Sequence, residues 1–99
     1  MGYPEKFDSW ADAIHAAPTR KDRAWVYLQR ALGRGSRRLI ASDIDRALST
    51  LYSSFDAEGY VAHNKLPWTK RGLHAAARKL LDKLAEEDQA MSLNESARV

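Results

Sequence analysis

The strongest pattern in this sequence is a run of apolar residues at helical spacing in the middle of the chain. Its members are Ile44, Ala47, Leu48, Leu51, Tyr52 and Phe55. Steps of three and four residues place side chains on one face of an α-helix, so the run predicts a helix with one buried face. Ser42 with Asp45 is typical of a helix start, and Gly59 is typical of a helix end. We therefore expect one helix between Ser42 and Gly59.

Three more segments combine a capping residue with apolar residues at helical spacing. Ser9 and Pro18 bound a short first helix, and Thr19 precedes a second helix over residues 20–32. Thr69 begins the last helix. The apolar face of this last helix comprises Leu73, Ala76, Ala77, Leu80, Leu81 and Leu84. Helices that are joined by short connections pack as a compact, largely antiparallel bundle.

Residues 60–69 separate the third and fourth expected helices. Apolar and aromatic residues flank Asn64-Lys65, and asparagine tolerates the positive φ of a tight turn, so this segment predicts either a minimal β-hairpin or a structured loop. The expected fold class is mostly α, a compact bundle of about four helices with a possible β-hairpin at residues 60–69. Residues 1–88 are expected to form a single helical domain, and residues 89–99 a frayed C-terminal tail.

The helical stripes also predict which side chains form the core. The predicted buried residues are Trp25, Leu28, Ile44, Leu48, Leu51, Leu80 and Leu81. Trp10 lies on the apolar face of the first helix and is expected to join them. Trp68 follows Pro67 beside basic residues. Its ring is expected either to fill the base of the hairpin or to be an exposed anchor for a partner.

Composition excludes several classes of protein. A chain of 99 residues makes one domain at most, and its apolar share of 44% is too high for a disordered chain. The absence of cysteine excludes a disulfide scaffold and a thiolate metal site, and it fits a cytoplasmic protein. No apolar run approaches the roughly 18 residues that span a bilayer, and the first residues carry no signal-peptide pattern, so no membrane association is expected.

No residue pattern indicates an enzyme site or a cofactor. His15, His63 and His74 do not stand at metal-ligand spacing from one another or beside a carboxylate. No nucleophile elbow is present, and Gly33 and Gly35 are not followed by the Gly-Lys-Ser/Thr of a phosphate-binding loop. We therefore expect a binding protein that is not an enzyme and needs no cofactor.

The net charge of +3 is distributed unevenly along the chain. Residues 19–83 carry 14 lysine or arginine residues and six acidic residues, whereas both ends of the chain are mildly acidic. Such an excess of positive charge fits either an anionic partner or a merely solvated surface. The candidate binding residues are Arg34, Arg37 and Arg38 in a glycine-containing loop, Lys65, Lys70 and Arg71 around the next connection, Arg46 on the third helix, and Trp68.

A resemblance to winged helix-turn-helix DNA-binding domains covers residues 49–72. It is carried by residues 49–61, which include the Glu58-Gly59 pair, and by the run from Trp68 to Gly72, which includes a Thr-x-x-Gly motif. These segments resemble the second half of such a domain. The resemblance implies a recognition helix that ends in a glutamate-glycine turn, a two-stranded wing after it, and a further helix that opens at Thr69.

Two functions are compatible with these observations. The first is a small DNA-binding regulatory protein, with DNA favoured over RNA, in which the basic residues contact phosphates and Arg46, Ser49 and Ser53 face base edges. The alternative is a small protein-binding adaptor or inhibitor that blocks a larger host protein or nucleoprotein assembly. Its basic face would meet an acidic surface of the partner, with Trp68 or Tyr60 as anchor. A homodimer is compatible with either function.

Overall fold

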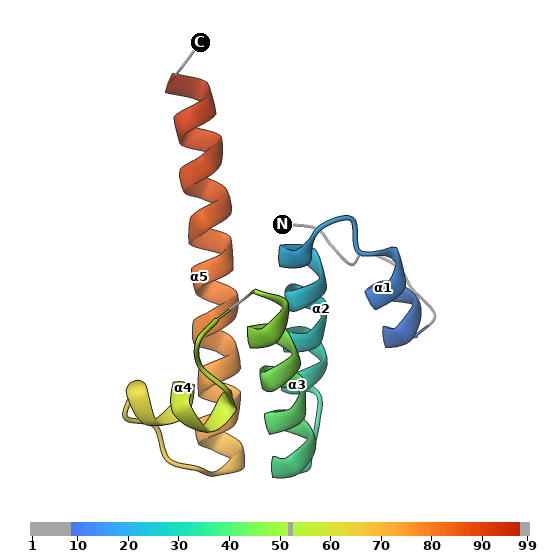
Figure 1. Ribbon diagram of the computed structural model, residues 1–99, viewed down its shortest axis with the longest axis vertical. Helices are drawn as coiled ribbons and strands as arrows, with labels where there is room; N and C mark the ends of the chain where they lie inside the picture. The colour runs from blue at the N-terminus through green and yellow to red at the C-terminus, as the bar shows by residue number, and fades with distance from the viewer. Residues whose placement is uncertain (1–8, 52, 98–99) are drawn as a thin grey trace.

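The computed structural model describes residues 9–51 and 53–97, with the backbone alone for residues 88–97, and it is built from helices (Figure 1). The helices in these ranges are α1 (Trp10–Ala16), α2 (Arg20–Leu32), α3 (Arg37–Thr50), α4 (Ala57–His63) and α5 (Lys70–Ala97). The mostly helical fold class predicted from the sequence is therefore confirmed. The described residues form five helices, where about four were expected, and they contain no strand.

Three predicted helix starts are confirmed by side-chain caps. The Ser9 hydroxyl oxygen accepts the backbone NH of Asp12 at 3.2 Å, and the Thr19 hydroxyl oxygen accepts that of Asp22 at 3.1 Å. The Thr69 hydroxyl oxygen accepts the backbone NH of Gly72 at 3.0 Å. Each cap satisfies one of the NH groups that the first turn of a helix leaves without a backbone partner.

The predicted third helix is instead two helices. α3 begins at Arg37, so Ser42 lies inside the helix rather than at its start, and α3 ends at Thr50. The Ser53 NH bonds to the Leu48 carbonyl at 3.0 Å, which turns the chain away from the helix axis. A new cap follows at Asp56, whose carboxylate accepts the Gly59 NH at 2.8 Å. Gly59 consequently lies within α4 and does not end a helix.

The predicted β-hairpin at residues 60–69 is wrong. Residues 60–63 complete α4, and the chain then turns at Lys65, whose φ is 56°. The Leu66 NH bonds to the Val61 carbonyl at 2.9 Å, and this bond closes the end of the helix. A turn does occur at Asn64-Lys65, but the positive φ falls on Lys65 instead of Asn64, and the turn ends a helix instead of joining two strands. The wing that the resemblance implies is therefore not formed in this segment.

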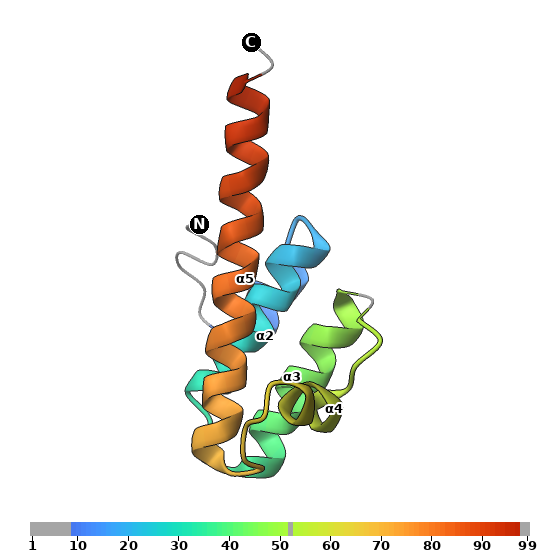
Figure 2. The same cartoon turned by 90° about the vertical axis from the view of Figure 1, so that its left-hand side faces the viewer.

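The core lies where α2, α3 and α5 meet, as Figures 1 and 2 show. Five of the predicted core residues are buried: Leu28, Ile44, Leu48, Leu80 and Leu81. Trp25 and Leu51 are only partly buried and pack against this core. Trp10, which was also expected in the core, is 44% exposed because α1 is short and lies on the outer side of α2.

α5 continues past the other helices of the bundle to Ala97 (Figure 2). The division into a domain that ends at residue 88 and a frayed tail stays a prediction. Among the described residues, no helix is both long enough and apolar enough to span a bilayer.

Candidate nucleic-acid interface

The start of α3 and the start of α5 lie side by side at one end of the bundle (Figures 1 and 2). The Arg37 guanidinium donates to the carbonyl oxygen of Trp68 at 3.4 Å, which joins the two helix starts. A second link lies nearby, where Nε2 of His74 is 3.2 Å from the carbonyl oxygen of Arg34. Two segments that are about 30 residues apart in sequence therefore form one surface.

Five of the eight predicted site residues belong to these two helix starts. One is Trp68, and the other four are Arg37, Arg38, Lys70 and Arg71, which we call the basic end. All four are exposed, and each lies in the first turn of its helix. The amino ends of two helices add a partial positive charge to the same region, so the basic end has the electrostatic character of an anion-binding surface.

A hollow of about 670 Å³ opens beside the basic end. It is lined by Ser36, Arg37, Arg38, Ala41, Ser42, Asp45 and Trp68. Trp68 is 40% exposed, so it does not fill the base of a hairpin. Its environment is that of the other expectation, an exposed aromatic residue. The hollow thus combines an aromatic wall, two guanidinium groups and several hydrogen-bonding side chains.

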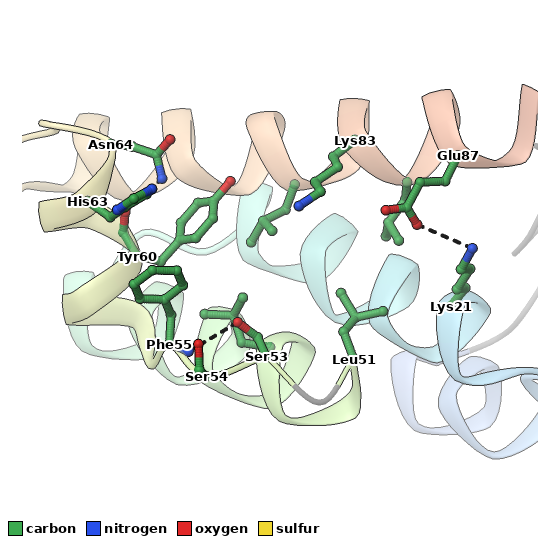
Figure 3. Close-up of a pocket in the computed structure, with 13 residues that line it drawn as sticks. Lys21, Leu51, Ser53, Ser54, Phe55, Tyr60, His63, Asn64, Lys83 and Glu87 are labelled. Atoms are coloured by element: carbon green, nitrogen blue, oxygen red, sulfur yellow. Dashed lines mark hydrogen bonds and ion pairs between the residues drawn. The ribbon is translucent and has the colours of Figure 1, made fainter. Parts of the chain in front are cut away.

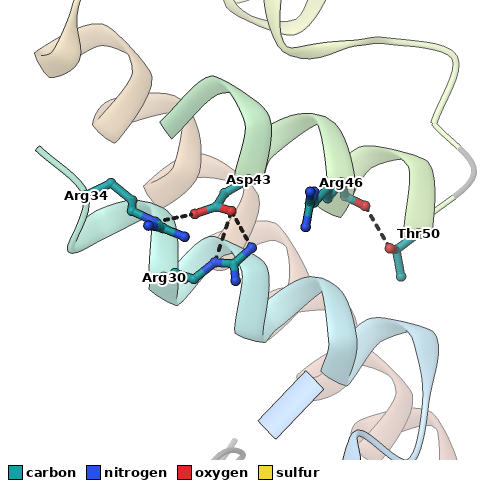
Figure 4. A network of polar contacts seen from close by, with 5 residues as sticks. All are labelled: Arg30, Arg34, Asp43, Arg46 and Thr50. Carbon is teal, nitrogen blue, oxygen red and sulfur yellow. Dashed lines mark hydrogen bonds and ion pairs between the residues drawn. The ribbon is translucent and has the colours of Figure 1, made fainter. Parts of the chain in front are cut away.

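Arg34, which was predicted as a binding residue, is part of a structural ion-pair network (Figure 4). Its Nε atom donates to Oδ2 of Asp43 at 3.3 Å, while Arg30 donates to Oδ1 of the same carboxylate from Nε at 3.0 Å and from Nη2 at 2.7 Å. Asp43 is 2% exposed, and the two arginines supply the hydrogen bonds that a buried carboxylate needs.

The ion pair between Asp43 and Arg30 was not predicted from the sequence, although the position of Asp43 on α3 indicates that it is buried. Asp43 is three residues after Ile40 and four residues before Ala47, and both of these are buried. A carboxylate on the buried face of an amphipathic helix requires a cationic partner. Spacing on α3 could have identified Asp43, but it could not have identified which arginines pair with it.

Arg46 and Lys65 lie apart from the basic end. Arg46 is exposed on α3, more than two turns beyond Arg37, and Figure 4 shows its side chain outside the Asp43 network. Lys65 is exposed in the turn after α4. No described contact connects either residue to Arg37 or Trp68.

A second, more apolar pocket of about 580 Å³ opens between α4, α5 and the segment after α3 (Figure 3). Phe55 lies at its edge, 38% exposed, with its ring centroid 4.9 Å from that of His63 and 6.4 Å from that of Tyr60. Lys21 pairs with Glu87 at 3.2 Å on the rim, and the Lys83 side chain also lines the pocket.

Tyr60 lies on α4 with its side chain half-buried. Burial raises the pKa of its phenol above the usual value, while a side-chain hydrogen bond with Asn64 acts in the opposite direction. A raised pKa keeps this phenol neutral over a wider pH range. No cluster of three or more histidine, cysteine or acidic residues that could hold a metal ion occurs in the described part of the chain.

Comparison with known proteins gives no match. No protein-family model matches the chain, and no curated protein or solved structure is significantly similar to it.

Proposed function

We propose that this protein is a small nucleic-acid-binding protein, with DNA as the favoured partner, that contacts phosphates through its basic end. The observation that carries the proposal is the hydrogen bond from Arg37 to the Trp68 carbonyl. It holds the start of α3 against the start of α5, so that Arg37, Arg38, Lys70 and Arg71 share one surface. Phosphate contacts from such residues supply most of the affinity of sequence-independent binding.

The roles of the other predicted residues differ under this proposal. Arg34 has a structural role in this proposal, because its guanidinium forms an ion pair with Asp43. Arg46 and Lys65 have no described contact with the residues of the basic end, so the proposal assigns them no phosphate. The proposal therefore rests on four cations and Trp68, and it does not require the winged helix-turn-helix resemblance.

The test is a salt titration of binding to random-sequence DNA, in single-stranded and duplex form. The logarithm of the binding constant should fall with the logarithm of salt concentration by about 0.9 per phosphate contacted on a duplex and about 0.7 on a single strand. Replacing Arg37 and Arg38 together by alanine should flatten the slope by up to about 2 units on a duplex.

The matched control is the Arg78→Ala/Lys79→Ala variant, which removes the same charge from exposed positions further along α5. Its slope should stay within about 0.5 unit of the wild type. Absence of detectable binding by the wild type to either form of DNA at about 50 mM salt would refute the proposal.

A specific observation favours the alternative of a protein-binding adaptor or inhibitor. The pocket in Figure 3 is lined by several leucines and has an exposed aromatic edge at Phe55, with Lys83 and the Lys21–Glu87 ion pair also lining it. Such a pocket fits an apolar side chain on an acidic protein surface. If this function is correct, a partner captured from host lysate should survive nuclease treatment. It should be lost with Phe55→Glu but retained by the Arg37→Ala/Arg38→Ala variant.

A further inference from the structure

The hollow beside the basic end contains more than phosphate-binding groups. Trp68 forms one wall and is 40% exposed. The side chains of Ser36, Ser42 and Asp45 line the same space. A hydrogen bond fixes the position of Asp45, because one of its carboxylate oxygens accepts the backbone NH of Ala57 at the start of α4. The hollow therefore offers an aromatic residue, hydroxyl groups and a carboxylate beside two arginines, Arg37 and Arg38.

This combination does not suit a phosphate backbone alone. A carboxylate repels phosphate, so Asp45 opposes the binding of any phosphate placed deep in the hollow. The same carboxylate accepts hydrogen bonds from the exocyclic amino groups of cytosine and of other amino-bearing bases. An exposed tryptophan ring binds the flat face of a base, and stacking of this kind tolerates any base sequence.

We propose that the hollow accepts one unpaired base, which stacks on Trp68, so that the protein binds single-stranded nucleic acid in preference to duplex. In a duplex the faces of the bases are covered by their neighbours, and their pairing edges are occupied. A single strand exposes both. Arg37 and Arg38 line the hollow, and Lys70 and Arg71 follow Trp68 in the sequence at the start of α5, so the phosphates next to the stacked base would meet the cations of the basic end.

This inference rests on the proposed function, because a base reaches Trp68 only if the basic end binds its strand. Beyond the proposed function, it specifies single-stranded nucleic acid as the partner and Trp68 as the residue that selects it. The volume of the hollow, about 670 Å³, lies within the range of 300 to 1,000 Å³ that is usual for small-ligand pockets and is sufficient for one nucleotide.

The test compares binding of one labelled oligonucleotide of about 12 nucleotides, single-stranded and annealed to its complement, by fluorescence anisotropy at fixed salt. The wild type should bind the single strand at least about fivefold more tightly than the duplex. Trp68→Ala should weaken single-strand binding by at least about fivefold and change duplex binding by less than about twofold. Trp68→Phe, which keeps an aromatic face, should retain most of the single-strand affinity.

Trp10→Ala is the matched control, because Trp10 is exposed to a similar extent on α1 and lies outside the hollow. It should leave both affinities unchanged. Circular dichroism of each variant checks that the helices are intact, and quenching of tryptophan fluorescence on binding should be reduced in Trp68→Phe.

Failure of this inference and failure of the proposed function would give different binding results. Equal or tighter binding to duplex, or equal weakening of both by Trp68→Ala, would overturn this inference and leave the proposed function standing. No binding to either form would refute both.

Discussion

Arg30 and Asp43 form the most buried ion pair among the described residues, with Nη2 of Arg30 2.7 Å from Oδ1 of Asp43. The Asp43 side chain is 3% exposed and that of Arg30 is 15% exposed, so water contributes little to the solvation of either charge. The pair connects α2 to α3, and Arg34 adds a third hydrogen bond from the loop between these helices. Asp43 therefore joins α3, whose first turn carries Arg37 and Arg38, to α2 and to the loop that precedes α3.

The first prediction concerns this network. Replacing Asp43 by alanine leaves Arg30 without a counter-charge in a largely buried position, and the free energy of unfolding should fall by about 3–5 kcal/mol. Asp82→Ala, at an exposed position on α5, should change it by less than about 0.5 kcal/mol. Urea unfolding monitored by circular dichroism measures both values. A loss for Asp43→Ala as small as that for Asp82→Ala would show that the pair does not stabilise the fold.

The second prediction concerns Gly72 in the first turn of α5. A Cβ atom at this position would clash with the carbonyl oxygen of Pro67, so the chain before α5 can approach the helix only if residue 72 is glycine. Gly72→Ala should lower the free energy of unfolding by about 1–3 kcal/mol, as expected for overpacking. Gly35→Ala, where a Cβ atom would meet open space, should change it by less than about 1 kcal/mol. Equal effects in thermal unfolding would contradict the close approach.

The third prediction concerns the apolar face of α3. Leu48 is 2% exposed in the core, so Leu48→Ala should cost about 2–5 kcal/mol of unfolding free energy. Leu39→Ala removes the same atoms from a position on α3 that is 38% exposed, and it should cost less than about 1 kcal/mol. Denaturant titration of the two variants provides the comparison. A loss below about 0.5 kcal/mol for Leu48→Ala would mean that α3 presents another face to the core.

The fourth prediction concerns pH and Tyr60. Burial raises the pKa of this phenol in the folded state, so the unfolded chain releases the proton first as pH rises. The stabilising contribution is complete below the unfolded pKa of about 10, and it is lost as pH rises through the higher folded value. The free energy of unfolding should therefore decline as pH rises above about 10, and less steeply in Tyr60→Phe than in the wild type. Identical slopes would show that Tyr60 does not contribute to the decline.

The helices of this protein were largely predictable because their signals are local. Thr19 caps the helix that follows it, as its spacing from Asp22 indicates, and Thr69 caps the last helix as predicted. The break between α3 and α4 was not predictable in the same way. The apolar spacing continues through Phe55, whereas the chain turns because Leu48 and Asp45 receive hydrogen bonds from residues after the helix. These hydrogen bonds end the helix although the apolar spacing continues.

The candidate site was predictable only in part, because the sequence shows which residues are basic but not which of them lie together. The basic residues are visible in the sequence, but their grouping depends on a contact between Arg37 and Trp68, which are 31 residues apart. Arg34 belongs to a structural ion pair and not to the binding surface, because it pairs with Asp43. Only the packing of α2 against α3 reveals this pairing. Charge patterns identify candidate residues, and the fold decides which of them act together.

Binding of nucleic acid at the basic end can be located by nuclear magnetic resonance of the nitrogen-labelled protein during titration with a random-sequence single strand. The amide signals of residues 36–38 and 68–72, and the indole signal of Trp68, should shift together as the strand binds. Signals from α1 and from the pocket around Phe55 and Tyr60 should stay in place. Shifts confined to that pocket, with the signals of Arg37 and Trp68 unchanged, would show that the basic end is not the binding surface.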